Sequence, residues 1–349
     1  MALLADYTTL GLGGPARTFV SAATEAELIA AIRSADAARE PVLIIGGGSN
    51  LVVSDEGFSG TVVHVSTRGR TVTETSEDAA EVTVAAGEDW DGVVAATVAE
   101  GLAGLETLSG IPGRAGATPI QNVGAYGREV AEVITQVRVY DRQEDQIQVF
   151  QNDRCSFAYR TSLFKAVGTR YVVLAVTFRL ARQPMSMPVR YAELAGELGV
   201  TMGERAGTGE VRSAVLKIRA RKGMVISPGD PDTRSAGSFF TNPVISAAEF
   251  SRVEATATAR DAGPVPGYPA GDGLVKVPAA WLIERSGFAK GYGAPAPARV
   301  SSKHTLALTN ANNATTADLL SLAREIVNGV QDAFGITLTP EPILVGVTL

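Results

Sequence analysis

Cysteine and histidine are scarce in this chain of 349 residues, and their scarcity excludes several kinds of chemistry. The single Cys155 cannot form a disulfide within the chain, so nothing indicates a disulfide-stabilised exported protein. There are only two histidines, and one of them, His64, lies in a predicted strand, TVVHV. A serine hydrolase needs a histidine base and commonly a G-x-S-x-G turn, and that turn is absent. Clusters with metal-ligand spacing are also absent. Acid–base chemistry must therefore rest on Ser, Tyr, Lys, Arg or carboxylates, or on a cofactor.

Long apolar runs and an excess of basic residues are missing too. No uninterrupted run could cross a bilayer, and the first residues, MALLADYTTLGLG, lack the basic region and apolar core of a signal peptide. The net charge is −6 and the pI is about 5.2, which argues against a nucleic-acid partner. Apolar residues make up 45%, and the length allows two or three domains. We expect a cytoplasmic protein with no membrane or nucleic-acid partner.

Two common nucleotide-binding motifs fail. No G-x-x-x-x-G-K-[ST] occurs, which disfavours a P-loop nucleotide hydrolase. Gly46 and Gly48 begin a G-x-G-x-x-G, but Leu51 occupies its sixth position, so the dinucleotide fingerprint is broken.

What the sequence does contain is a stretch rich in glycine and proline, SGIPGRAGATPIQNVGAYGREV, residues 109–130. Glycine permits unusual backbone angles and close approach to a ligand, and proline removes a donor. Such a segment is not a regular helix or strand, but it can shape a loop whose N–H groups point at an anion. The amides of Gln121 and Asn122 could bind a ring or a diphosphate. The alternative is a long surface loop.

A second stretch, PVLIIGGGSNLVV at residues 41–53, predicts a strand, a tight glycine turn and another strand. Together the two glycine-rich loops could hold one large cofactor that carries a diphosphate.

The rest of the chain predicts further strands and helices. A capping box at Thr24 and Glu27 begins a helix. Five apolar residues alternate in RYVVLAVTFRL, which favours a half-buried strand. Strands are expected at 82–87, 133–141, 146–150, 170–180 and near the C-terminus, and helices at 24–40, 89–100, 209–223, 246–260, 278–287 and 316–334. Strands dominate the first half and helices the second, so an α+β enzyme is expected, with a candidate domain boundary in the loop 227–237.

Three side chains are candidates for chemistry, each with a structural alternative. Arg160 lies among aromatic residues in FAYRTSLFK and is either a packed structural arginine or a carboxylate clamp. Ser238 in AGSFFTNP is either a turn residue or a proton donor. Glu341 in TPEP is either an exposed carboxylate near the chain end or one held by its two flanking prolines.

The ordered series GGGSN, IPGRAGATPIQNVGAYG, YRTSLFK, AGSFFTNP, WLIE and PEP resembles the UDP-N-acetylenolpyruvoylglucosamine reductases, flavoenzymes of bacterial peptidoglycan precursor synthesis. The match extends from Leu10 to Leu349. The resemblance implies an α+β fold with a two-subdomain, vanillyl-alcohol-oxidase-like FAD-binding region and a C-terminal α+β substrate-binding domain. It assigns residues 1–65, joined by the strand region 336–349, to the first subdomain, 66–223 to the second, and 224–335 to the substrate domain.

The resemblance also implies site residues. Arg160 and Glu341 would flank the substrate carboxylate and stabilise an enolate, and Ser238 would supply a proton. FAD would be held by Gly46, Gly47, Gly48, Ser49, Asn50, Leu51, Gly110, Ile111, Pro112, Gly113, Gly116, Ala117, Gln121, Asn122, Gly124, Ala125, Tyr126 and Gly127. The UDP-sugar would be bound or the site ordered by Tyr191, Lys222, Asn242, Tyr268, Lys276 and His304. Tyr191 is similar to the tyrosine of a mobile substrate-covering loop found in one subtype of the family.

The implied reaction begins with reduction of the flavin by NADPH, since only a cofactor can carry hydride here. Hydride would then pass from flavin N5 to C3 of the enolpyruvyl group, and Ser238 would protonate C2 to give UDP-N-acetylmuramate. A monomer that serves cell-wall biogenesis, cell shape and cell division is expected. Two alternatives stay open: an alcohol or lactone oxidase with the same kind of FAD domain, and a non-catalytic nucleotide-binding module.

Overall fold

The longest strand, β12 (Tyr171–Arg182), lies inside a six-stranded sheet of the computed structural model, which describes residues 2–349. The strand order is β11-β10-β12-β6-β5, and a short β7 pairs with β12 at its end. The other strands of this sheet are β5 (Arg70–Ser76), β6 (Ala79–Ala85), β7 (Leu102–Ala103), β10 (Ile134–Asp141) and β11 (Gln146–Gln151). Every pairing between them is antiparallel.

The strand predicted at 170–180 is confirmed as β12, and Val172, Leu174, Val176, Phe178 and Leu180 are all buried. Val173 and Thr177, on the opposite face, are buried as well, so the expectation of a half-buried strand is wrong. A strand in the middle of a sheet that is covered on both faces loses the simple in–out pattern expected of a half-buried strand. The central position of β12 therefore accounts for its nearly continuous apolar sequence.

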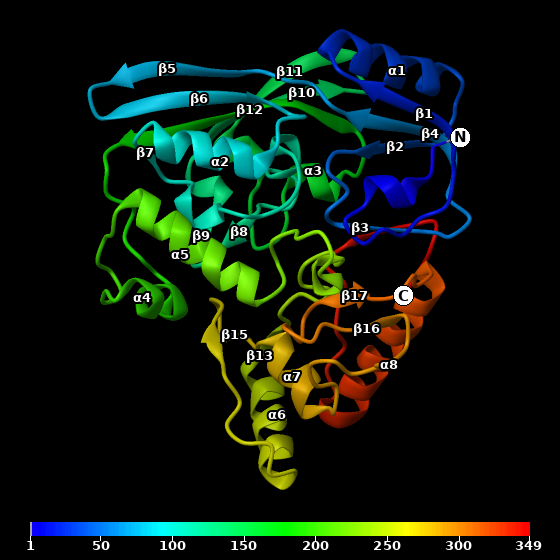
Figure 1. Ribbon diagram of the computed structural model, residues 1–349, viewed down its shortest axis with the longest axis vertical. Helices are drawn as coiled ribbons and strands as arrows, with labels where there is room; N and C mark the ends of the chain where they lie inside the picture. Colours follow the sequence, from blue (N-terminus) through cyan, green and yellow to red (C-terminus); the bar gives the residue numbers. More distant parts are fainter. Residues whose placement is uncertain (1) are drawn as a thin grey trace. The chain divides into compact units, whose positions relative to one another are not determined.

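Helix α2 (Trp90–Ala99) packs along this sheet (Figure 1). The Asp89 side chain accepts a hydrogen bond from the Gly92 N–H and caps the helix start. The Trp90 ring lies 5.7 Å from the Phe178 ring, so the first turn of α2 is anchored directly on β12. The predicted helix at 89–100 is confirmed.

A separate three-stranded sheet has the order β1-β4-β2, with parallel pairing throughout. Its strands are β1 (Ala16–Ala22), β2 (Val42–Ile45) and β4 (Phe58–Val65). Helix α1 (Glu25–Ala37) follows β1, and its predicted capping box between Thr24 and Glu27 is present. The buried Leu28 and Ile32 of α1 belong to the same core as Val63 of β4, and this packing stabilises the parallel sheet.

Three further small elements complete this part of the chain, the paired strands β8 (Gly124–Ala125) and β9 (Arg128–Glu129) and the helix α3 (Leu163–Ala166). Helices α4 (Ala192–Leu198) and α5 (Thr208–Arg221) form a small core of their own, built around Val189, Leu194 and Val215. Among the described residues, Ala2, residues 16–48 and residues 58–221 make up the first of two structural units.

The second unit combines Leu3–Pro15, Ser49–Gly57 and Lys222–Leu349. Its elements are β3 (Leu51–Val53), β13 (Val244–Ser246), α6 (Ala247–Ala259), β14 (Tyr268–Pro269), β15 (Leu274–Lys276), α7 (Ala279–Arg285), β16 (Ala298–Val300), β17 (Leu308–Asn310), α8 (Thr316–Phe334) and β18 (Ile343–Val345). The three helices predicted here are confirmed, whereas the hairpin β16–β17 and the sheet β13-β15-β14 were not predicted. Strands of two or three residues are too short to leave a periodic pattern in the sequence.

The strands on either side of GGGSN do not pair with one another. β2 belongs to the parallel sheet of the first unit, whereas β3 pairs in parallel with β18 at the far end of the chain. The Asp55 carboxylate, just after β3, accepts hydrogen bonds from the Thr316 and Ala317 N–H groups and so caps α8. Residues 49–57 and the C-terminal residues that include β18 thus belong to the same structural unit.

Across residues 2–349, no helix combines the length and the apolar composition that a membrane span requires.

Candidate active site

The two glycine-rich loops meet in the first unit, where their backbones are in direct contact. A Cβ atom added to Gly47 would lie 2.8 Å from the Gly113 Cα. A Cβ added to Gly46 would lie 3.1 Å from the Arg114 Cγ. No side chain larger than hydrogen fits at Gly47 without movement of the opposing backbone. Glycine is therefore required here because two loops touch.

The second loop is fixed on the large sheet by its backbone. The Gly116 N–H donates to the Ala86 carbonyl at 2.9 Å, and the Trp90 N–H donates to the Gly113 carbonyl at 3.1 Å. A Cβ on Gly116 would lie only 2.5 Å from the Ala86 Cβ. The loop is thus a shaped, ordered structure, not the surface loop of the alternative interpretation.

These loops offer a fitting site for a diphosphate-bearing cofactor. Small residues leave the backbone open. The stem of Arg114 packs against Gly46, and its buried Nε makes no hydrogen bond within residues 2–349. Burial lowers the pKa of His64, and the nearby Arg114 and Arg68 guanidiniums lower it further, which reflects positive potential around this residue. Amide groups and a cation together suit an anionic group such as a diphosphate.

Asn122 is used inside the protein. Its Nδ2 donates to the Glu129 carboxylate at 2.7 Å and to the Ala158 carbonyl at 3.1 Å, and its Oδ1 accepts the Ala131 N–H. The residue is buried and has a left-handed φ of 47°. Its side chain therefore holds the bend of the glycine-rich stretch.

Arg160 is held against the same stretch. Its Nη2 donates to the Gly124 carbonyl at 2.7 Å, its Nη1 donates to the Asn122 carbonyl at 3.4 Å, and the guanidinium lies 5.2 Å from the centre of the Tyr159 ring. The φ of Arg160 is 56°, an angle that a non-glycine residue adopts rarely and at some energetic cost. The loop therefore holds the guanidinium beside the glycine-rich stretch.

Tyr126 and Tyr191 form an aromatic pair in the first unit. Their ring centres are 5.4 Å apart and the rings are perpendicular. Burial raises the pKa of the Tyr126 phenol to about 12, although the nearby Arg219 guanidinium opposes the rise. The phenol therefore stays protonated at neutral pH. Tyr191 itself is 42% exposed, so its ring can still contact a ligand.

Ser238 and Glu341 come from two segments that pair through their backbones in the second unit. The Glu341 N–H donates to the Phe239 carbonyl at 2.8 Å, and Phe240 bridges Pro340 in antiparallel fashion. The rings of Phe239 and Phe240 are buried 5.1 Å apart, which anchors the segment that follows Ser238.

Asn50 forms two further hydrogen bonds to the segment that contains Glu341. Its backbone carbonyl accepts the Ile343 N–H at 3.0 Å, and its Nδ2 lies 3.4 Å from the Glu341 carbonyl oxygen as a donor. Ser49, Asn50 and Leu51 thus belong to the second unit, whereas Gly46, Gly47 and Gly48 belong to the first. The motif GGGSN therefore contributes residues to both units.

Asn242, Tyr268 and Lys276 gather around the small sheet that was not predicted. Lys276 of β15 is opposite Tyr268 of β14 and Val244 of β13. The Asn242 Oδ1 accepts the Ala279 N–H at the start of α7. The sheet therefore presents a phenol and an ammonium side by side.

Lys222 and His304 lie in less regular parts of the second unit. Lys222 directly follows α5. The His304 N–H donates to the Ser301 Oγ, and the adjacent Lys303 Nζ is 2.5 Å from the Asp230 carboxylate. Burial alone would raise the pKa of Asp232, but hydrogen bonds from Ser302 lower it overall. These contacts join the loop that carries His304 to the segment that leads into Ser238.

The first unit therefore brings together the glycine-rich loops, Arg160, Tyr126 and Tyr191, and the second unit brings together Asn50, Ser238 and Glu341. Arg114 and Arg219 were not predicted as site residues. Arg114 is part of the motif IPGRAG, and a cation within a glycine-rich loop is the signal that could have identified it.

Comparison with known proteins settles the family. An FAD-binding domain matches residues 16–149, and the C-terminal domain of UDP-N-acetylenolpyruvoylglucosamine reductase matches residues 230–345. The reductase of that name from Thermobifida fusca is 57% identical, over 99% of this chain and 97% of its own length. The one from Streptomyces avermitilis is 55% identical, over 99% and 94%. The chain belongs to the UDP-N-acetylenolpyruvoylglucosamine reductase family.

The solved structure of the UDP-N-acetylenolpyruvylglucosamine reductase from Thermus caldophilus matches as well, with a TM-score of 0.66 and 26% identity over 99% of this chain and 97% of that one. The resemblance inferred from the sequence is thus confirmed, together with the α+β fold of an FAD-binding region and a C-terminal reductase domain. As a member of this reductase family with an FAD-binding domain, the protein is an oxidoreductase. The alternatives of an alcohol or lactone oxidase and of a non-catalytic module are wrong.

Proposed function

We propose that this reductase converts UDP-N-acetylglucosamine enolpyruvate to UDP-N-acetylmuramate, with NADPH as the source of reducing equivalents. Family membership supports the substrate and the flavin. The structural observation that carries the proposal is the backbone pairing of Phe239 with Glu341, because it holds a hydroxyl residue and a carboxylate residue at neighbouring positions.

FAD would be bound by the two glycine-rich loops, Gly46–Leu51 and Gly110–Gly127, and by Arg114. When bound, FAD supplies the hydride that NADPH provides and the enolpyruvyl group receives. The contact between Gly47 and Gly113 keeps the two loops together and so shapes the cradle.

Arg160, Ser238 and Glu341 would act on the enolpyruvyl group. Reduction at C3 places negative charge on C2 and the adjoining carboxylate, and a fixed guanidinium stabilises such charge better than mobile water does. We assign this role to Arg160, together with Glu341 on the other side of the carboxylate. The Ser238 hydroxyl would give its proton to C2, which completes the saturated product.

The remaining polar residues would bind the UDP-sugar. Lys222 and Lys276 carry positive charge suited to a diphosphate, and Tyr191, Asn242, Tyr268 and His304 offer hydrogen bonds or stacking surfaces. Tyr268 and Lys276 face each other across β14 and β15, which supports a joint contact with one ligand group.

We further propose the three-part division of the sequence analysis, with residues 1–65 and 336–349 in one subdomain, 66–223 in a second and 224–335 in the substrate domain. The parallel pairing of β18 with β3 supports the return of the C-terminus to the first 65 residues. A cytoplasmic monomer in peptidoglycan precursor synthesis completes the proposal.

Anaerobic half-reactions test this function. NADPH should bleach the flavin absorbance of the purified protein, and UDP-N-acetylglucosamine enolpyruvate should then restore it with formation of UDP-N-acetylmuramate. The rate of flavin reduction by NADH, measured in the same way, shows which of the two coenzymes the protein prefers. A flavin that NADPH reduces but the enolpyruvyl substrate never reoxidises would contradict the proposed substrate.

A further inference from the structure

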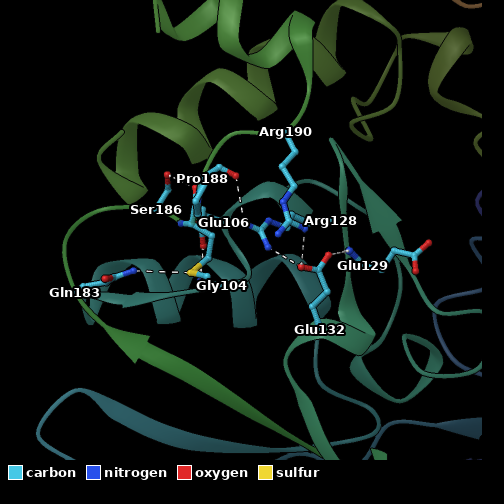
Figure 2. Close-up of polar contacts among 10 residues, drawn as sticks. Gly104, Glu106, Arg128, Glu129, Glu132, Gln183, Ser186, Pro188 and Arg190 are labelled. Carbon is cyan, nitrogen blue, oxygen red and sulfur yellow. Dashed lines mark hydrogen bonds and ion pairs between the residues drawn. The ribbon is translucent and has the colours of Figure 1, made fainter. Parts of the chain in front are cut away.

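The segment 183–190, which connects β12 to α4 and ends next to Tyr191, is held by two buried charged side chains. Glu106 is 1% exposed, and its carboxylate accepts the Gly104 N–H at 2.6 Å and the Met187 N–H at 3.0 Å. Arg128 is 8% exposed, and its Nη2 donates to the Pro188 carbonyl at 3.2 Å. Figure 2 shows both side chains meeting the segment.

A further carboxylate extends this cluster. Glu132 accepts the Arg128 Nη1 at 2.5 Å and the Arg190 Nη1 at 3.2 Å, and its other oxygen accepts the Glu129 N–H (Figure 2). Glu106 and Arg128 are buried, and a buried charged group that satisfies several partners is costly to disturb, because its removal leaves those partners unpaired. The segment is thus held at Met187 and Pro188, and an exposed ion pair adds to this at Arg190.

Three consecutive residues of the glycine-rich stretch, Tyr126, Gly127 and Arg128, contact this segment or Tyr191, which follows it. Tyr126 packs edge-on against Tyr191, and Arg128 binds Pro188. Between them, a Cβ added to Gly127 would lie 2.9 Å from the Arg190 Cβ, and its φ of 79° also demands glycine. The stretch proposed to hold the cofactor therefore also supports the residue proposed to contact the substrate.

We propose that Glu106 and Arg128 are positioning residues for substrate binding: by fixing residues 187–190 they hold the Tyr191 ring against Tyr126, ready to contact the UDP-sugar. This proposal rests on the substrate role of Tyr191 given above. Neither side chain needs to touch the substrate, because each acts through the backbone of the segment.

Glu106→Gln tests the idea with little change in size, since the amide can accept only one of the two N–H groups. We expect the KM for UDP-N-acetylglucosamine enolpyruvate to rise about tenfold, a factor typical of one lost charged hydrogen bond. FAD content and the rate of reduction by NADPH should stay unchanged. Arg128→Lys, which keeps the charge but cannot bind Glu132 and Pro188 together, should act in the same direction. Glu77→Gln, at an exposed turn residue, is the matched control.

The decisive measurement is a double-mutant cycle with Tyr191→Ala. If Glu106 acts through Tyr191, Glu106→Gln should raise KM by less than about twofold in the Tyr191→Ala background, because effects on one shared interaction do not add. Equal factors in both backgrounds would overturn the positioning role and leave the proposed function intact. A Tyr191→Ala enzyme with normal KM would overturn the substrate role of Tyr191 and this proposal with it.

Hydrogen exchange gives a readout that does not depend on activity. In Glu106→Gln, the Met187 and Val189 amides should exchange faster than in the wild type, whereas those of β6 should not change. Unchanged exchange at Met187 would show that Glu106 does not hold the segment, and would overturn the proposal even if KM had risen.

Discussion

The two units fix their proposed catalytic residues by different means. In the first unit, Arg160 is held by its own side chain, which donates to the carbonyls of Gly124 and Asn122. In the second unit, Ser238 and Glu341 are held by the backbone next to them, through the bond from the Glu341 N–H to the Phe239 carbonyl. A group held by backbone can be replaced without loss of local structure, whereas a side chain that is itself a structural contact cannot. Substitution of Ser238 should therefore report chemistry alone.

Ser238→Ala should lower the turnover rate more than any other substitution proposed here. It should also separate the two half-reactions most clearly. Loss of a general acid commonly lowers a rate by about 10²–10⁴-fold, so turnover with the enolpyruvyl substrate should nearly vanish while reduction of the flavin by NADPH continues. Stopped-flow measurement of both half-reactions checks this. An equal loss in both would contradict the role of proton donor.

Arg160→Ala should come next, with the oxidative half-reaction slowed by about 10²–10³-fold, as for removal of one preorganised donor. Unlike Ser238→Ala, it should also lower the free energy of unfolding by about 1–3 kcal/mol, because it removes charged hydrogen bonds to the loop. Urea unfolding of both variants sharpens the comparison. Loss of bound FAD would instead assign Arg160 a purely structural role.

Gly47→Ala should weaken FAD binding, since the new methyl group would lie 2.8 Å from the Gly113 Cα. We expect the dissociation constant of FAD to rise about tenfold or more, in line with the strain of overpacking. Titration of the apoprotein with FAD measures it. Gly209→Ala is the control, because a Cβ there meets no atom within 4 Å. Equal affinity in both variants would argue that the loop contact does not shape the cofactor site.

Asn50→Ala should have a smaller effect. The long hydrogen bond to the Glu341 carbonyl is worth about 0.5–1.5 kcal/mol, so the oxidative half-reaction should slow by less than about tenfold with FAD retained. Asn312→Ala, at an exposed position of the same unit, is the control. A variant that has lost its FAD would show that the Asn50 side chain serves the cofactor more than Glu341.

The smallest effect is expected from pH. Burial would raise the pKa of Asp91, but the Arg212 guanidinium and the Gly110 N–H lower it below the usual 3.8. A carboxylate with a depressed pKa stabilises the fold fully above its unfolded pKa and loses that contribution as the pH falls through the folded value. Unfolding stability should therefore drop more steeply below about pH 4 in the wild type than in Asp91→Asn. Identical acid profiles for the two proteins would contradict this.

Much of the first unit could be predicted from sequence, because long strands and capped helices leave periodic patterns. The alternating residues of β12 and the capping box at Thr24 are examples. The glycine-rich loops could be recognised, but not their contact, since the Gly47–Gly113 approach joins residues far apart in the chain. The pairing of Phe239 with Glu341 and the sheet around Lys276 were equally hidden, because segments of two or three residues carry no periodicity. Asn122 illustrates a different difficulty. An amide side chain can bind a ligand, but the sequence does not show that the Asn122 amide forms hydrogen bonds to Glu129 and Ala131 within the protein.

The pairing of β3 with β18 has a consequence for how this chain is made. Residues 49–57 are synthesised well before their strand partner, Ile343–Val345. The second unit therefore cannot close until residues 343–345 have been synthesised, whereas residues 58–221 can begin to fold earlier. A prematurely terminated chain would keep an exposed β3 edge and lack Glu341 altogether. Every copy in which the second unit is fully folded has thus been synthesised at least through β18.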